Sequence, residues 1–103
     1  MRQKKYILMM DNHGYIELRF GYPFYHKDLI NKDESQHDCL GGGNWDIDSE
    51  GNVILFGSSC DFGAPGKQDL EKAIKNFADW DYFEWICEHI YAEVHLSKNI
   101  ITK

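Results

Sequence analysis

The sequence predicts a small α/β protein: a single domain, residues 1–103, in which a mixed β-sheet has helices packed on its faces. A chain of 103 residues is long enough for one hydrophobic core and too short for two. Hydrophobic residues make up 43% of the chain and charged residues 27%, the balance of an ordinary globular protein. Segments with strand and helix patterns follow one another along the chain, and that order favours a sheet covered by helices.

The first two strands are predicted to form a hairpin. Residues 6–10 are wholly apolar, and residues 15–20 alternate apolar and polar side chains. The segment between them reads Asp-Asn-His-Gly, which is typical of a tight turn. Residues 24–32 then predict a short helix.

The middle of the chain predicts two more strands and a second helix. Residues 33–38 are wholly polar and predict a loop, after which the chain runs through three glycines into a strand over residues 44–48. Residues 53–56 are β-branched, aliphatic and aromatic and form the clearest strand. Beyond a loop at residues 57–66, apolar residues recur at helical spacing between residues 69 and 77.

The last third of the chain is less regular. Residues 82–86 are rich in strand-favouring side chains and predict a strand, with a helix through Trp85 and His89 as the alternative because periodicity alone does not decide. The tail, residues 93–103, is expected to be a short extra strand or disordered. Residues 1–4 are expected to be peripheral or disordered.

Charge and cysteine content exclude several classes of function. The net charge of −6 argues against a broad electrostatic surface for nucleic acid or anionic lipid, so we expect neither a nucleic-acid partner nor a membrane. The apolar run at residues 6–10 is too short for a signal-peptide core or a membrane span. Cys39, Cys60 and Cys87 are far apart with no CxxC spacing, which favours a reducing, cytoplasmic location without disulfides.

We expect no metal and no cofactor. The carboxylate pairs Asp46/Asp48 and Asp79/Asp81 could hold a hard cation, but they adjoin turns and have no EF-hand spacing. Solvated surface carboxylates are the commoner explanation of such pairs.

Glycine-rich segments frame the strand at residues 53–56. Gly41, Gly42 and Gly43 precede it, and the loop Gly57-Ser-Ser-Cys-Asp-Phe-Gly63 follows it. Glycine is costly in regular structure, roughly 0.5–1 kcal/mol relative to alanine, so positive φ angles or a close approach to the backbone are expected there. A small-residue loop between a strand and a helix can bind an anion through free amides; the alternative is a tight connection without a ligand.

Among the five histidines, His26 is the candidate for chemistry. Histidine is the side chain whose ordinary pKa lies nearest neutrality. His26 opens the predicted helix at residues 24–32, where a helix terminus and a bound anion would be its neighbours. The alternative is an exposed residue in the first turn of a helix.

Three segments resemble one family, the Janus/Ocnus phosphohistidine phosphatases. Residues 39–43, Cys-Leu-Gly-Gly-Gly, resemble the same five residues of that family. Residues 56–63, Phe-Gly-Ser-Ser-Cys-Asp-Phe-Gly, resemble its Tyr-Gly-Tyr-Ser-Met-Ala-Tyr-Gly loop, and residues 25–29, Tyr-His-Lys-Asp-Leu, resemble its Tyr-His-Ala-Asp-Ile. The segments occur in the family's order, and the resemblance spans roughly residues 5 to 86.

The resemblance implies a phosphohistidine phosphatase-like fold and a set of site residues. His26 matches the catalytic histidine, which serves either as general base for water or as the group that receives the phosphoryl. Lys5 matches a lysine near the site. The loop that holds the phosphate is matched by Ser58, Ser59, Cys60 and Asp61, of which Ser59 matches the family's serine.

The chain departs from the family pattern at two site positions. Asn44 stands where the family has an arginine, and an amide cannot form a bidentate cationic clamp. Asp61 stands where the family has an alanine, which places a negative charge beside the expected phosphate. Arg19 lies within one residue of a family arginine and could replace the lost cation.

Two functions follow from the resemblance and its departures. The first is a hydrolase that removes the phosphoryl group from phosphohistidine or another phosphoramidate, with a phosphorylated protein or a small phosphoramidate as its substrate. The alternative is a non-enzymatic relative with a degenerate phosphate site that acts as a binding or interaction module. A homodimer through a strand edge or through residues 80–91 is also open.

Overall fold

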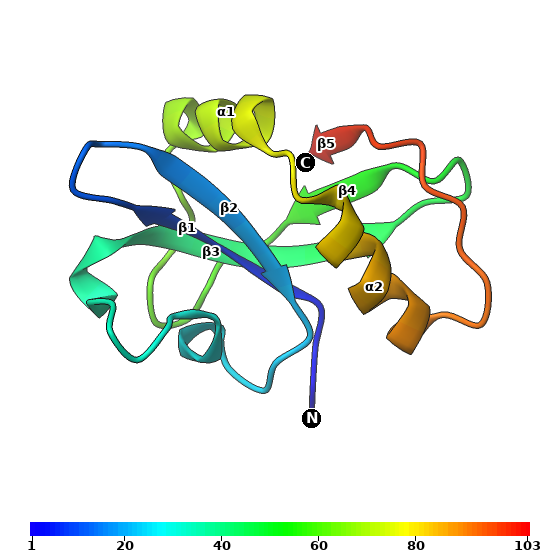
Figure 1. Ribbon diagram of the computed structural model, residues 1–103, viewed down its shortest axis with the longest axis horizontal. Coiled ribbons are helices and arrows are strands. Elements are labelled where there is room, and N and C mark those ends of the chain that lie inside the picture. Colours follow the sequence, from blue (N-terminus) through cyan, green and yellow to red (C-terminus); the bar gives the residue numbers. More distant parts are fainter.

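The computed structural model describes all residues, 1–103, and contains a five-stranded mixed sheet and two α-helices (Figure 1). Two single turns of 3-10 helix, η1 and η2, precede β3. The elements in chain order are β1 (Lys5–Met10), β2 (Ile16–Gly21), η1 (His26–Leu29), η2 (Gln36–Asp38), β3 (Cys39–Ile47), β4 (Val53–Phe56), α1 (Lys67–Asn76), α2 (Trp80–Ile90) and β5 (Ile100–Thr102).

The sheet has the strand order β2-β1-β3-β4-β5. The predicted hairpin of β1 and β2 is confirmed, with Leu8 opposite Leu18 and Asp11 N–H bonded to the Tyr15 carbonyl. β1 also pairs antiparallel with β3, and β3 with β4. Only β4 and β5 run parallel, which makes the sheet mixed and leaves β2 and β5 at its two edges.

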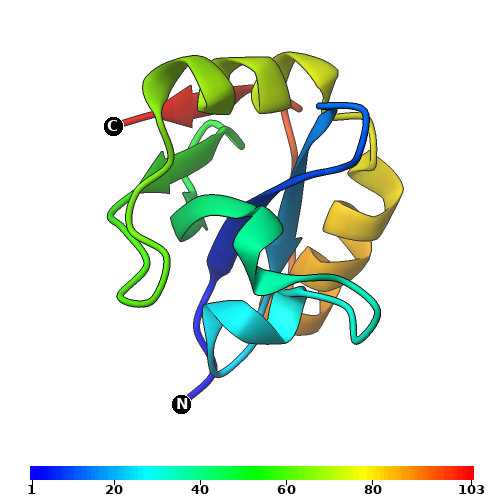
Figure 2. The same cartoon turned by 90° about the vertical axis from the view of Figure 1, so that its left-hand side faces the viewer.

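Both α-helices pack on the same face of the sheet. Alternate residues of the strands point to this face, as the period of two in a strand requires. They form one core with Ala73 of α1 and Phe83, Ile86 and Cys87 of α2. The buried strand residues of this core are Tyr6, Leu8, Ile16, Leu18, Phe20, Trp45, Val53 and Leu55. The opposite side of β1, where Ile7 is fully buried, is covered by η1, as Figure 2 shows in a side view.

The prediction of a strand at residues 82–86 is wrong, because these residues belong to helix α2. The buried residues Phe83, Ile86 and Cys87 lie three and four positions apart, whereas Glu84 and Trp85 are exposed. That is a helical period, and it follows the core contacts rather than the strand preference of the aromatic side chains. The helix at residues 69–77 is confirmed as α1.

The helix predicted at residues 24–32 is only one 3-10 turn, η1. Asp28 accepts a hydrogen bond from the Tyr25 amide at its start. The Leu29 carbonyl, which would continue a helix, instead accepts a hydrogen bond from Arg19 on β2 (3.2 Å), and Ile30 is extended. A four-residue turn has no appreciable macrodipole, so that part of the argument for His26 does not hold.

Both ends of the chain contact the domain. Lys4 Nζ lies 2.8 Å from an Asp46 carboxylate oxygen and 3.0 Å from the Tyr91 hydroxyl. Between the two expectations for the tail, the structure has the short extra strand, β5, beside β4. No helix is both long enough and apolar enough to cross a bilayer.

Candidate functional site

The three glycines of β3 allow two segments to approach the strand closely. A Cβ atom at Gly42 would meet the Tyr6 carbonyl oxygen and would lie 3.1 Å from Cδ2 of His26. A Cβ at Gly41 would lie 2.6 Å from the backbone nitrogen of Pro65, and Gly41 also has a φ of +135°. The glycines are therefore required by close packing of η1 on one side and of the 57–66 loop on the other.

His26 is buried against β3, with 6% of its surface exposed. Its ring nitrogen Nε2 lies 2.8 Å from the Gly43 carbonyl oxygen, which can only accept, so Nε2 carries the hydrogen. Every fully buried side-chain nitrogen has a hydrogen-bond partner, and Nδ1 has none within the protein, so Nδ1 is not completely buried. The surroundings thus fix both the tautomer and the direction of the ring.

The environment of His26 keeps its imidazole neutral near pH 7. Burial lowers the pKa of His26, since the charged ring loses hydration. The Lys5 ammonium lowers the pKa further, while the hydrogen bond to Gly43 and the Asp61 carboxylate act in the opposite direction. The net shift is downward from 6.5, so Nδ1 has a free lone pair at neutral pH.

The loop after β4 folds back onto the glycine strand. The Ser59 amide donates to the Gly42 carbonyl (2.9 Å), and the Gly42 amide donates to the Gly63 carbonyl (2.9 Å). Gly57 and Gly63 have φ of +71° and +70°, which glycine adopts without strain. His26 and the loop are therefore both bound to the glycine triad, Gly41–Gly43: His26 through Gly43, and the loop through Gly42.

Within the loop, Ser59 is buried and the other matched residues are exposed. The Ser59 hydroxyl oxygen accepts from the amides of Asp61 (3.3 Å) and Phe62 (3.2 Å). The amides of Ser58 and Cys60 donate to no protein group. Because α1 begins only at Lys67, the candidate anion donors are loop amides rather than helix amides.

The structure brings most of the predicted site residues together. Lys5 lies opposite Asn44 in the pairing of β1 with β3, on the face that carries His26, and its ammonium donates to Gln3 (2.9 Å). Asn44 is half-buried, and its amide would lie 2.8 Å from a Cβ at Gly57. The Asp61 side chain makes no hydrogen bond, so its carboxylate caps no loop amide.

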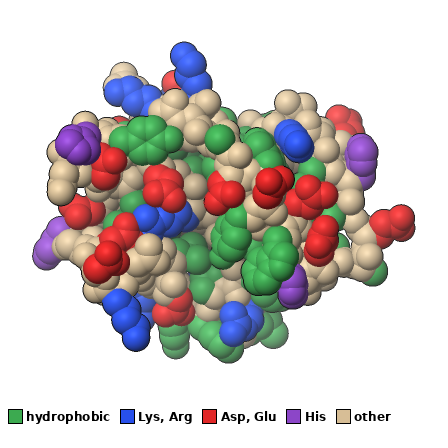
Figure 3. All heavy atoms as spheres, in the orientation of Figure 1, with side chains coloured by type: hydrophobic (Ala, Val, Ile, Leu, Met, Phe, Trp, Pro, Cys, Tyr) green, Lys and Arg blue, Asp and Glu red, His purple; other side chains and the backbone are tan.

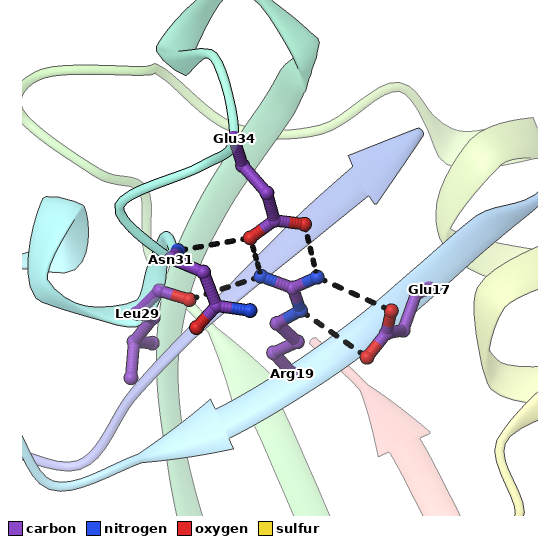
Figure 4. Close-up of polar contacts among 5 residues, drawn as sticks. All are labelled: Glu17, Arg19, Leu29, Asn31 and Glu34. Atoms are coloured by element: carbon purple, nitrogen blue, oxygen red, sulfur yellow. Dashed lines mark hydrogen bonds and ion pairs between the residues drawn. The ribbon is translucent and has the colours of Figure 1, made fainter. Parts of the chain in front are cut away.

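The Arg19 guanidinium is engaged by other groups of the protein (Figure 4). Its guanidinium holds both carboxylate oxygens of Glu34 at 2.6 Å, reaches Glu17 at 3.2 and 3.3 Å and donates to the Leu29 carbonyl. These bonds use the guanidinium edges that a bidentate phosphate contact needs. Arg19 is therefore not free to bind a phosphate.

The main surface hollows lie away from His26. Grooves of about 480 and 590 Å³ border β2 and α2, and a shallower one of about 390 Å³ includes Asn44. His26 lines none of these three. No group of three or more His, Cys, Asp and Glu side chains is arranged to hold a metal ion. Sequence reasoning missed the groove along β2, for which the paired charges Glu17 and Arg19 gave no clear signal.

Comparison of the chain with protein-family models, with curated proteins and with solved structures found no match.

Proposed function

We propose that the chain is a phosphohistidine phosphatase-like hydrolase that removes a phosphoryl group from a phosphoramidate, either on a protein or on a small molecule. The observation that supports this most is the fixed tautomer of His26, whose Nε2–H is held by Gly43 while Nδ1 has no hydrogen-bond partner in the protein. A neutral Nδ1 can take a proton from water as the water oxygen bonds to phosphorus and the phosphorus–nitrogen bond of the substrate breaks, the leaving nitrogen taking up a proton. Alternatively, Nδ1 itself bonds to phosphorus as that phosphorus–nitrogen bond breaks, and water then hydrolyses the phosphorylated ring.

The loop and Lys5 supply the electrostatic part of the proposal. Phosphoryl transfer depends mainly on positioning and on donors aimed at the phosphoryl oxygens. The free amides of Ser58 and Cys60 are such donors, and Lys5 adds a positive charge near the His26 ring.

The test is phosphate release from phosphohistidine and from phospholysine. We expect His26→Ala to reduce turnover by about a hundredfold or more, the scale of a lost general base. His13→Ala, an exposed turn residue, is the matched control and should be unchanged. A melting curve must show that His26→Ala is folded. Turnover that survives in a folded His26→Ala protein would exclude the proposal.

The pH profile provides a second readout. Turnover needs neutral Nδ1, and the pKa of His26 is lowered from 6.5, so activity should rise with pH through a midpoint below 6.5. A midpoint above that pH would point to another group.

A second candidate function is favoured by Asn44 and Asp61. Asn44 offers no cation, and the Asp61 carboxylate is near enough to affect the pKa of His26, so an oxyanion there meets repulsion. The alternative is therefore a non-catalytic relative that uses the scaffold for binding.

A double variant distinguishes the two candidates. Asn44→Arg with Asp61→Ala restores the family's charges, so an active enzyme should gain several-fold in kcat/KM. The loss of kcat/KM on His26→Ala should persist in that background. A wild-type protein without turnover that gains it only in the double variant would identify the degenerate, non-catalytic relative.

A further inference from the structure

The strand β2 has one free edge. In an antiparallel pair, every second residue exchanges hydrogen bonds with the partner strand. The backbone N–H and C=O groups of the residues between them point away from the partner. The bonds of Asp11 to Tyr15 and of Gln3 to Pro23 fix this alternation at both ends of the β1–β2 hairpin. The N–H and C=O groups of Ile16, Leu18 and Phe20 therefore point away from β1.

A groove lies over this edge. Its volume is about 480 Å³, and it extends along β2 from Ile16 to Phe20. Figure 1 shows β2 passing between α1 and the segment after β2. Apolar side chains such as Leu29, Phe77 and Phe83 contribute to its walls. The outward backbone groups of Ile16, Leu18 and Phe20 thus border this hollow, and these residues are 6%, 3% and 3% exposed.

A second groove of about 590 Å³ continues the first and shares Asp28, Leu29 and Tyr82 with it. It runs along α2, where Tyr82 and Trp85 are half exposed and stacked with ring centres 5.9 Å apart. Stacked aromatic faces attract the cationic heads of Arg and Lys. The two grooves together form a continuous surface from β2 to α2.

The groove along β2 is acidic. Glu17, Asp28 and Asp79 line it, and the only cation among its lining residues is Arg19. Arg19 is already neutralised by Glu17 and by Glu34. The space-filling view shows acidic side chains in a band across this side of the molecule, beside exposed hydrophobic surface (Figure 3).

We propose that the edge of β2 binds an extended basic peptide, which adds to the sheet as a sixth strand. Backbone hydrogen bonds to Ile16, Leu18 and Phe20 supply the pairing, and alternate side chains of the peptide enter the groove. Its Lys or Arg residues are matched by Asp28 and Asp79, and by the faces of Tyr82 and Trp85. A second copy of this chain fits less well, because it would bring the same carboxylates together. The proposal requires no chemistry at His26.

The test uses a heptapeptide, Lys-Val-Arg-Val-Lys-Val-Arg, and the full chain in low salt. Its binding should protect the amide hydrogens of Ile16, Leu18 and Phe20 from exchange, with those of Glu17 and Arg19 already protected by β1. A peptide with Glu at every basic position is the control for charge and should not bind. Two N-methylated versions control for pairing: methylation of the alternate amides that face β2 should abolish binding, and methylation of the other set should not.

A matched pair of protein variants tests the surface. Asp79→Lys reverses a charge in the groove and should weaken binding roughly three- to tenfold, the range for an exposed charge pair lost and replaced by repulsion. Glu50→Lys makes the same change in net charge in the exposed turn before β4 and should leave binding unchanged.

Three results would overturn the proposal. One is equal binding of the acidic and basic peptides, and another is binding without protection of Ile16, Leu18 and Phe20. The third is protection of these amides without peptide that rises with protein concentration, which would identify a second copy as the occupant.

Discussion

Arg19 links the segment that carries His26 to the sheet. Its guanidinium on β2 holds the Leu29 carbonyl at the end of η1 and the Glu34 carboxylate in the following loop. Glu34 in turn accepts the Asn31 amide at 2.8 Å. Bidentate arginine–carboxylate pairs are the strong form of such contacts. Arg19, which the sequence predicts as a cation for the substrate, thus holds the segment after η1 on the sheet.

The contact between Arg19 and Glu34 predicts a pH dependence of stability. The hydrogen bond from Arg19, with that from the Asn31 amide, lowers the pKa of Glu34 to about 2 from 4.5. A depressed carboxyl pKa stabilises the fold above the unfolded value, and this stabilisation is lost as pH falls from about 4.5 toward 2. Glu34→Gln should lower the free energy of unfolding by about 1 kcal/mol at pH 7. It should also reduce the loss of stability between pH 4.5 and pH 2.

Chemical denaturation between pH 2 and pH 7 measures both effects. Glu50→Gln is the control, because Glu50 is exposed and its side chain makes no polar contact. If wild type and Glu34→Gln lose stability in parallel between pH 4.5 and 2, the assigned role of the Arg19–Glu34 pair is wrong.

The candidate site was predictable only where local sequence determines placement. The three glycines of β3 and the 57–63 loop predict that another segment closely approaches the backbone, and the structure has such contacts at Gly42 and Gly41. The burial of His26 depends on a contact with Gly43, seventeen positions along the chain, which no local pattern encodes. The engagement of Arg19 depends equally on Glu34, in a loop whose polar sequence predicts only exposure.

At the scale of elements, helix α2 shows how burial decides between two local preferences. Its aromatic residues favour a strand, but the buried residues Phe83, Ile86 and Cys87 and the partly buried Ile90 repeat with a helical period. A window limited to residues 82–86 is too short to display that period. The strands β1, β2 and β4 were predictable because each is apolar or alternating over its full length and ends at turn residues.

A pair of truncations tests the helical assignment of α2. Phe83 is fully buried, and Trp85 is 55% exposed. In a helix these residues lie on nearly opposite sides, whereas in a strand they share a face. We expect Phe83→Ala to cost about 3–5 kcal/mol of unfolding free energy and Trp85→Ala less than about 1 kcal/mol. Comparable losses from the two variants in urea denaturation would contradict the helix.

At the scale of the molecule, the two sides of the sheet are protected from unwanted strand pairing in different ways. The β2 edge borders an acidic groove, and charged edges resist unwanted strand pairing. The other side of the sheet ends in β5, which covers the apolar strand β4. β4 consists of Val53, Ile54, Leu55 and Phe56, a short run without charge that would otherwise be exposed to pairing.

Removal of β5 should therefore cost both stability and solubility. A chain that ends at Lys98 loses the bonds from Val53 N–H to Asn99 (2.8 Å) and from Lys103 N–H to Leu55 (2.9 Å). At a net 0.5–1.5 kcal/mol for each hydrogen bond, plus the apolar cover of Ile100, the loss should be at least about 2 kcal/mol. The exposed β4 edge should then pair between molecules. Urea denaturation and sedimentation at several concentrations measure the two effects, with full-length Ile101→Ala as a control that keeps the backbone bonds. A truncated chain that stays monomeric and equally stable would show that β5 does not protect β4.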